Sequence, residues 1–221
     1  MYTWGTLINE ESLLYASGSH LKAMVLAAGV GSRLDPLTAQ LPKPLVPIAN
    51  RPVMEHVLGL LGNHGFRQIS VNLHHLPELI ENYFGDGSAF DIKLNYLLEK
   101  DLSGDAGGVR GCREHLQDGT FLVIMGDLLT NANLTYLLAQ HKKMAALATI
   151  ALTKVEDVSQ FGVALRDDDG WIKEFQEKPA RHEARSNLVS TGIYIFLSRP
   201  FLTLYRKLVF TALANSYFPS W

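Results

Sequence analysis

Cysteine is almost absent from this chain, which has 221 residues and a single cysteine, Cys112. A lone cysteine cannot form a disulfide within the chain, and it offers no second thiolate for a zinc site. The sequence therefore favours a reducing compartment, which we take to be the cytoplasm. We expect Cys112 to be a small buried residue on a helix rather than a reactive thiol.

The chain also lacks a charge excess of one sign and long apolar runs. Its net charge is −2, and lysine and arginine are not gathered into a basic block. Neither a nucleic-acid surface nor a basic membrane patch is indicated. The longest apolar run, residues 144–152, is far shorter than the ~18 residues that a membrane-spanning helix requires, and it is typical of a strand. The sequence predicts a soluble globular domain with neither nucleic acid nor membrane as a partner.

Apolar runs and helical periodicities alternate along the chain. This alternation predicts right-handed crossovers and a single α/β domain with a doubly wound (Rossmann-like), mixed, mostly parallel sheet. Ligand loops are expected at the carboxyl ends of the strands. The predicted strands are 23–28, 68–73, 91–98, 120–125, 144–152, 161–166, 171–176 and 187–196. The predicted helices are one beginning at Pro52 and those at 77–84 and 133–141.

A glycine-rich loop follows the first predicted strand. Residues 23–28 lead into Gly29 and Gly31, which can take positive φ and expose N–H groups to an anion without a Cβ in the way. Arg33 can make two-pronged contacts with phosphate oxygens, and Lys43 adds a mobile positive charge. The pair suits a polyphosphate better than a carboxylate substrate. On these residues alone, a simple glycine turn beside two surface cations remains the alternative.

The loop matches neither of two familiar phosphate motifs. The dinucleotide-binding fingerprint needs a third glycine where Leu34 stands. The P-loop needs Gly-Lys-Ser/Thr at the start of a helix, whereas residues 32–36 read SRLDP. Both classes of nucleotide-binding protein are therefore excluded.

A carboxylate ends the most apolar strand. Residues 120–125 (TFLVIM) are followed by Gly126 and Asp127, at the edge of the sheet where the phosphate loop is expected. Carboxylate oxygens suit Mg²⁺, so we predict that Asp127 binds this ion, with capping of the next turn as the alternative. His74 and His75 follow another strand at this edge. Neighbouring side chains of an extended chain point in opposite directions, so the two would not readily chelate one metal together. We expect loop histidines there rather than catalytic ones.

These segments together resemble the sugar-1-phosphate nucleotidylyltransferase family. The resemblance rests on GVGSR at 29–33, with Ser32 where threonine is commoner, on LPKPL at 41–45 and on VIMGD at 123–127. The loop SGDAG at 103–107 is similar to the family's L-G-T-A-G, with Ser103 and Asp105 in place of leucine and threonine. On these residues alone, a glycine-rich helix start is the alternative. EKP at 177–179 and NLVSTGIYIF at 187–196 resemble its sugar-side elements.

The resemblance implies an activity and a site. The activity is transfer of a nucleotidyl group from a nucleoside triphosphate to a sugar 1-phosphate, giving a nucleotide-sugar and pyrophosphate. The branch resembled most is the mannose-1-phosphate guanylyltransferases, which implies GTP and mannose 1-phosphate. The implied catalytic residues are Arg33, Lys43 and Asp127, with Mg²⁺ on Asp127. The implied nucleotide contacts are Leu26, Ala27, Ala28, Gly29, Gly31, Ser32, Arg33, Gly107 and Gly108. The implied sugar-phosphate contacts are Glu177, Lys178, Thr191 and Gly192.

The two ends of the chain depart from that family. Residues 1–21 are expected to be an extension before the nucleotidyltransferase domain, with translation starting near Leu21 as a hypothesis. The resemblance covers 22–197 and is lost over 198–221, so a strand carrying a second metal-binding aspartate is missing. Codons for 197–221 can be chosen so that an adjacent frame spells FDFIP and QLFPKL, which look like the family's next segment. We therefore hypothesise a truncating frameshift near Ser198.

A competing function follows from the missing aspartate. The chain would then be an inactive fragment that binds a nucleotide or a sugar phosphate, or a regulatory subunit of an intact relative. The sequence leaves homo-oligomerisation open.

Overall fold

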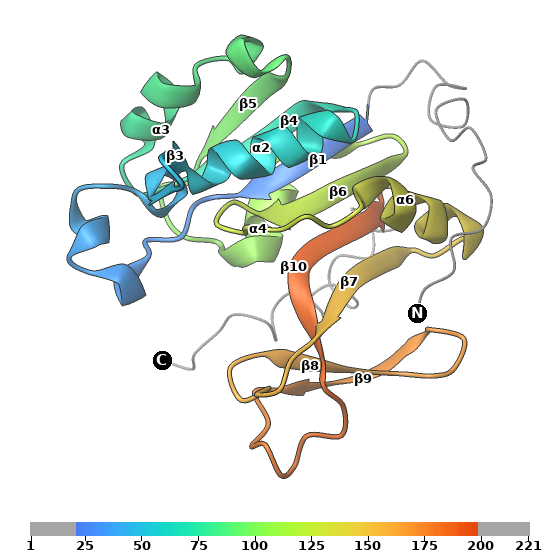
Figure 1. The fold of residues 1–221 in the computed structure, drawn as a ribbon. Helices are drawn as coiled ribbons and strands as arrows, with labels where there is room; N and C mark the ends of the chain where they lie inside the picture. Colours follow the sequence, from blue (N-terminus) through green and yellow to red (C-terminus); the bar gives the residue numbers. More distant parts are fainter. Residues whose placement is uncertain (1–20, 199–221) are drawn as a thin grey trace.

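The computed structural model describes residues 21–198. The predicted extension and tail lie outside these residues, except for Leu21 and Ser198. Within them, one eight-stranded sheet has the order β5-β4-β1-β6-β10-β8-β9, and β7 pairs with β10 (Figure 1). Its strands are β1 (Leu21–Leu26), β4 (Phe66–Leu73), β5 (Lys93–Leu98), β6 (Thr120–Met125), β7 (Ala148–Lys154), β8 (Gly162–Arg166), β9 (Ile172–Glu177) and β10 (Leu188–Leu197).

Helices and a second, small sheet complete the described part. The two-stranded sheet consists of β2 (Pro47–Ile48) and β3 (Arg51–Pro52). The α-helices are α2 (Val53–Asn63), α3 (Pro77–Phe84), α4 (Gly104–Gly111), α5 (Arg113–Leu116) and α6 (Leu134–Lys143). The 3-10 turns are η1 (Ser32–Leu34), η2 (Leu37–Ala39), η3 (Lys43–Leu45) and η4 (Ser88–Phe90). None of the described helices is long and apolar enough to cross a membrane.

The sheet is mixed, as the sequence predicted. Strands β5, β4, β1 and β6 run parallel, and β10 lies antiparallel to β6. The crossovers between the parallel strands contain helices, which lie on both faces of the sheet. This is the doubly wound, Rossmann-like arrangement, and the prediction of the fold class is confirmed.

Strand β1 is apolar from Ala23 to Leu26 because both of its faces are covered there. Ala23 and Val25 lie in a core cluster with buried residues of α2, α3 and α6. Met24 and Leu26 lie in a second cluster with buried residues of α4 and α5. Alternate residues of a strand point to opposite faces, so the part of a strand that is covered on both faces is apolar at successive positions.

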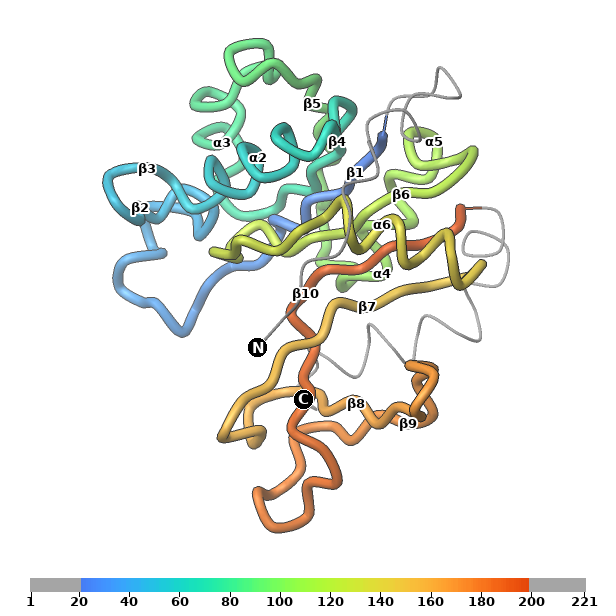
Figure 2. Tube along the Cα trace, turned by 45° about the vertical axis from the view of Figure 1, so that its right-hand side comes forward, coloured from blue at the N-terminus to red at the C-terminus, as the bar shows by residue number. Residues whose placement is uncertain are grey.

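The β8–β9 hairpin lies at some distance from the parallel strands (Figures 1 and 2). Strand β10 joins the two parts, because it pairs with β6 and β7 and also with β8. The hairpin turn is the predicted one, at residues 167–170: the amide of Gly170 donates to Asp167 O at 3.1 Å and its φ is +93°. Val158, Val163 and Val189 form a small cluster of their own here.

Other local predictions had mixed outcomes. The side chain of Asn133 caps α6 by accepting from the amide of Tyr136 at 2.8 Å, as expected. The strand predicted at 144–152 begins only at Ala148, because α6 continues to Lys143 and Ala145 (φ +45°) lies in the turn that follows the helix.

Cys112 is buried between α4 and α5 as a free cysteine, and burial raises the pKa of its thiol to about 12. It is therefore a packing residue.

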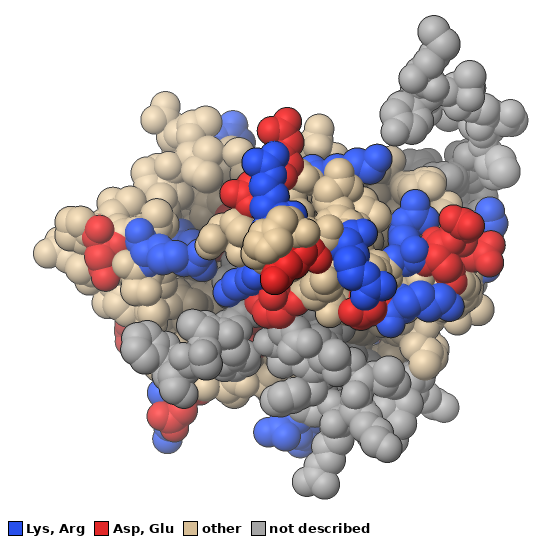
Figure 3. Space-filling view, turned by 90° about the horizontal axis from the view of Figure 1, so that it is seen from below, with Lys and Arg blue, Asp and Glu red and all other residues tan. Residues whose placement is uncertain are grey.

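The described surface carries both signs of charge. In the view from below, lysine and arginine side chains alternate with aspartate and glutamate side chains among the residues that are coloured (Figure 3). No single-sign field stands out on that part of the face, in line with the net charge of −2.

Candidate active site

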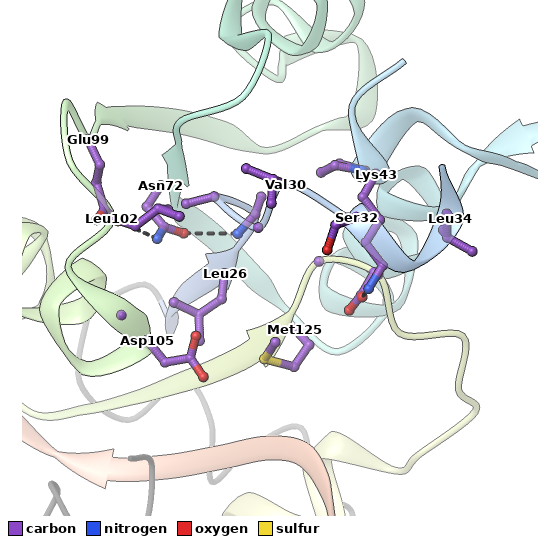
Figure 4. Close-up of a pocket in the computed structure, with 18 of the residues that line it drawn as sticks. Leu26, Val30, Ser32, Leu34, Lys43, Asn72, Glu99, Leu102, Asp105 and Met125 are labelled. Carbon is purple, nitrogen blue, oxygen red and sulfur yellow. Dashed lines mark hydrogen bonds and ion pairs between the residues drawn. The ribbon is translucent and has the colours of Figure 1, made fainter. Parts of the chain in front are cut away.

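A pocket of about 700 Å³ opens at the carboxyl ends of β1 and β6 (Figure 4). On one side lie the loop after β1, η1 and η3, and on the other lie the ends of β4 and β5 with the start of α4. The predicted residues that line the pocket are Leu26, Ala27, Ala28, Gly29, Gly31, Ser32, Arg33, Lys43 and Asp127. The structure thus brings together the whole predicted phosphate loop and both further catalytic candidates.

Gly31 gives the loop its shape. Its φ is +73°, and an added Cβ would lie 2.9 Å from Thr38 Cγ2 and 3.3 Å from Lys43 Cβ. A side chain at this position would therefore strain the backbone and push Thr38 of η2 away from the loop. The hydroxyl of Thr38 donates to the carbonyl of Gly31 at 2.9 Å, which holds the turn closed.

Lys43 and Asp127 form an ion pair inside the pocket. Their side chains are 29% and 22% exposed, so solvent screens the pair only partly. Gly126 allows the ends of β6 and β1 to approach each other. Its amide donates to the carbonyl of Leu26 at 2.8 Å, and an added Cβ would lie 3.0 Å from that same oxygen. The end of β6 is thereby held against the end of β1.

The residues present fit a magnesium ion. Asp127 offers carboxylate oxygens, and the lysine ammonium beside it shows that a cation is accommodated there. Within residues 21–198, no group of three or more His, Cys, Asp or Glu side chains could hold a metal. Magnesium does not need such a cage, because it commonly binds to one or two carboxylates and completes its shell with water and substrate phosphates.

Asp105 is a pocket residue that the sequence did not identify as one. It lies in the first turn of α4, and Figure 4 shows it across the pocket from Lys43 and Ser32. Burial raises the pKa of its carboxyl to about 6, and the nearby carboxylates of Asp127 and Glu99 add to this effect. The pocket therefore has a cationic side and an acidic side.

Asp105 should make stability depend on pH. A pKa that is higher in the folded chain than in the unfolded chain gives stability that is present at low pH and is lost as pH rises toward about 6. The change Asp105→Asn should therefore raise the free energy of unfolding by about 2 kcal/mol more at about pH 7.5 than at about pH 4. Urea unfolding at both pH values measures this. Asp101→Asn controls for loss of an exposed carboxylate on the loop that precedes α4. A pH-independent effect of Asp105→Asn would contradict the prediction.

The four predicted sugar-phosphate residues do not line this pocket. Glu177 and Lys178 lie at the end of β9, with Lys178 Nζ 3.8 Å from Glu177 Oε1. The hydroxyl of Thr191 donates to Ala151 O at 3.0 Å. Gly192 (φ +80°) packs against the pocket-lining Met125, whose Cγ would lie 2.6 Å from an added Cβ. Their contact with a sugar phosphate stays a prediction.

Gly107 and Gly108 belong to a helix, which agrees with the alternative of a glycine-rich helix start rather than with a loop. They lie inside α4, outside the residues that line the pocket. An added Cβ on Gly108 would lie 2.4 Å from Asn72 Nδ2 and 2.9 Å from Glu99 Oε1. The absence of a side chain at Gly108 therefore lets α4 pack closely against Asn72 and Glu99. Whether either glycine also contacts a nucleotide stays a prediction.

Gly108→Ala should destabilise the protein by about 1–3 kcal/mol, because the new methyl group overpacks a buried site. Gly59→Ala is the matched control, since Gly59 is an exposed helical glycine of α2 with nothing within 4 Å of an added Cβ. It should stabilise by about 0.5–1 kcal/mol. Thermal unfolding compares the two, and equal effects would show that the space around Gly108 is not restrictive.

Several lining residues were not predicted, and two histidines lie in a loop, as predicted. The additional lining residues are Val30, Leu34, Pro44, Asn72, Glu99, Leu102, Gly104, Asp105, Met125 and Gly126. His74 Nδ1 lies 2.9 Å from Glu99 O, and His75 Nε2 lies 2.9 Å from Thr38 O. The two rings thus contact different segments, as expected for loop histidines.

Comparison with known proteins agrees with this geometry. Residues 22–211 match the family described as Nucleotidyl transferase. The chain is 46% identical over 189 residues to a UTP–glucose-1-phosphate uridylyltransferase of Synechocystis sp., covering 80% of this chain and 49% of that protein. It is 33% identical over 174 residues to a mannose-1-phosphate guanylyltransferase of Mycobacterium tuberculosis, covering 79% and 48%.

Solved structures share the fold. A putative glucose-1-phosphate thymidylyltransferase from Bacillus anthracis superposes with a TM-score of 0.77 at 26% identity, covering 85% of this chain and 75% of that chain. A UDP-glucose pyrophosphorylase complexed with UDP-glucose superposes with a TM-score of 0.73 at 21% identity, covering 86% and 80%.

The chain spans about half the length of the curated relatives that it matches. The family match nevertheless covers most of the chain, including every described residue of the pocket. The chain therefore belongs to the nucleotidyl transferase family, within the group whose curated relatives are sugar-1-phosphate nucleotidyltransferases.

Proposed function

We propose that the protein transfers a nucleotidyl group from a nucleoside triphosphate to a sugar 1-phosphate and releases pyrophosphate. The observation that carries this proposal is the pocket itself, where the glycine loop, Arg33, Lys43 and Asp127 line one cavity at the carboxyl ends of β1 and β6. Parallel α/β sheets bind ligands at that edge.

The proposed reaction needs positioning more than covalent chemistry. A phosphate oxygen of the sugar 1-phosphate attacks the α-phosphorus in line, a new P–O bond forms, and the bond to pyrophosphate breaks. Two anions must be held together and the charge on the leaving group stabilised. Arg33 and the loop N–H groups would bind the triphosphate and stabilise the leaving pyrophosphate. Lys43 would contact the phosphates.

Asp127 would hold Mg²⁺, which neutralises charge on phosphate oxygens when bound. Lys43, which pairs with Asp127 in the structure, would instead contact a phosphate when the nucleotide is bound. Glu177 would accept hydrogen bonds from sugar hydroxyls while Lys178 meets the sugar phosphate, with Thr191 and Gly192 beside them. These four assignments rest on the sequence resemblance.

Two substrate pairs have support. UTP and glucose 1-phosphate are favoured by the relative that is 46% identical. GTP and mannose 1-phosphate are favoured by the sequence segments AGG and STGIYIF and by the relative that is 33% identical. We propose the first pair as the one to test first, because its relative is more similar to this chain.

Pyrophosphate release tests the proposed function. The purified chain is incubated with Mg²⁺, each of the four nucleoside triphosphates and a panel of sugar 1-phosphates. Release that requires both substrates supports a transferase and identifies the pair. Binding of a nucleoside triphosphate without any release would instead support the competing function, a nucleotide-binding fragment or regulatory subunit.

A further inference from the structure

Four hydrogen bonds form a continuous chain through the base of the pocket. The amide of Ala27 donates to Asn72 Oδ1 at 2.9 Å, and Asn72 Nδ2 donates to Glu99 Oε1 at 2.6 Å. Glu99 Oε2 then accepts from the Ser103 amide at 3.0 Å and from the Ser103 hydroxyl at 2.6 Å. Figure 4 shows Asn72 between Glu99 and the loop after β1. We call these bonds the Asn72–Glu99 chain.

The Asn72–Glu99 chain joins two walls of the pocket that are far apart in the sequence. Ala27 begins the phosphate loop after β1, and Ser103 directly precedes α4. Asn72 and Glu99 stand near the ends of β4 and β5, between these two segments. The loop is also held from its other side, because Leu26 O accepts from the amide of Gly126. The separation of the two walls is therefore set by side chains of intermediate strands.

The Asn72 and Glu99 side chains are shielded from water, which strengthens their hydrogen bonds. Asn72 is 3% exposed and Glu99 is 9% exposed. Hydrogen bonds to a charged group that is shielded from water are stronger than exposed neutral ones. Gly108 of α4 packs so closely on both side chains that there is no room for a Cβ. Both ends of the Asn72 amide are engaged within the protein, so the two bonds hold this side chain in one orientation.

We infer that Asn72 and Glu99 are positioning residues, which fix the distance between the phosphate loop and the start of α4 so that a nucleotide meets both walls at once. This inference rests on the proposed function. It assigns the two side chains an effect on nucleotide affinity that is transmitted through Ala27 and Ser103. A displacement of about 1 Å in such a wall can reduce the rate about 10²-fold.

The hydrogen bond between Asn72 and Glu99 has a direction, from the amide to the carboxylate, and reversing it tests the inference. Asn72→Asp keeps the acceptor for the Ala27 amide but places two carboxylates opposite each other. Glu99→Gln keeps the shape of the side chain, but its new N–H group then faces another donor, the amide of Asn72 or of Ser103. In the double variant N72D/E99Q, the new amide at position 99 can donate to the new carboxylate at position 72 and accept from Ser103. The double variant therefore restores all four hydrogen bonds with the direction of the middle one reversed.

The test measures dissociation constants for Mg²⁺·UTP and Mg²⁺·GTP, with kcat, KM and the unfolding midpoint of every variant. Each single variant should weaken nucleotide binding by about 10-fold or more, and N72D/E99Q should return to within about 3-fold of the parent. Asn63→Asp, the same chemical change at an exposed position of α2, should bind like the parent. Ser103→Ala removes one bond at an exposed residue, should fold, and should weaken binding about 3-fold.

Three results would overturn the inference. In the first, the single variants and Ser103→Ala bind nucleotide like the parent. In the second, the double variant is as weak as the weaker single variant. In the third, the unfolding midpoints fall while affinity and KM stay unchanged, as for a purely structural role. A parent that binds no nucleoside triphosphate would refute the proposed function, and this inference with it, before any variant is compared.

Discussion

Replacing Asp127 by asparagine is expected to reduce pyrophosphate release by about 10³-fold, which corresponds to about 4 kcal/mol of barrier. The substitution removes the negative charge that pairs with Lys43 and that we propose as the magnesium ligand. The amide keeps the size of the side chain, so the loss is of charge rather than of packing. The measurement is turnover as a function of Mg²⁺ concentration.

The control for this prediction is Asp101→Asn, which removes an exposed carboxylate outside the residues that line the pocket. It should leave turnover unchanged. The ligand assignment fails if Asp127→Asn shows magnesium-dependent binding of the nucleoside triphosphate equal to that of the parent.

The change Arg33→Ala is expected to lower kcat by about 10²-fold, equivalent to about 3 kcal/mol of barrier. The guanidinium lies in η1 beside the glycine loop and lines the pocket, and its contacts should strengthen as negative charge moves onto the pyrophosphate. The KM for the sugar 1-phosphate should change much less than kcat. Steady-state kinetics with each substrate varied in turn separates the two constants.

Arg113→Ala serves as the matched control, because Arg113 is an exposed arginine of α5 outside the pocket lining. Its removal should leave both constants unchanged. An unchanged turnover number in Arg33→Ala would rule out a role for this residue in stabilising the leaving group.

The parallel part of the fold was predictable because its signals are local. The predicted ranges 120–125 and 77–84 match β6 and α3 at both ends. Both signals, an apolar run that ends at a glycine and a proline at a helix start, depend only on neighbouring residues in the sequence. The first strand was placed at 23–28, whereas β1 spans Leu21–Leu26. Ala27 and Ala28 are equally apolar, so hydrophobicity alone did not show where pairing stops.

The site was predictable only where one segment supplies it. The phosphate loop and Asp127 follow directly from strands that end in glycine. Asn72, Glu99 and Asp105 were missed because their partners come from elements that meet only after folding. A signal did exist for one of them. Asn72 is a polar residue between Val71 and Leu73 near the end of β4, and a buried amide must find partners.

The ion pair between Lys43 and Asp127 has a consequence for the order in which ligands arrive. A free divalent ion that binds Asp127, as proposed above, must displace an ammonium group already there, so the loss of the lysine pair offsets part of the electrostatic energy that the ion gains. A metal ion that arrives with a triphosphate brings anionic oxygens that give Lys43 a new partner. The pocket is thereby biased toward taking up metal and nucleotide together, and a bare ion should compete poorly for it.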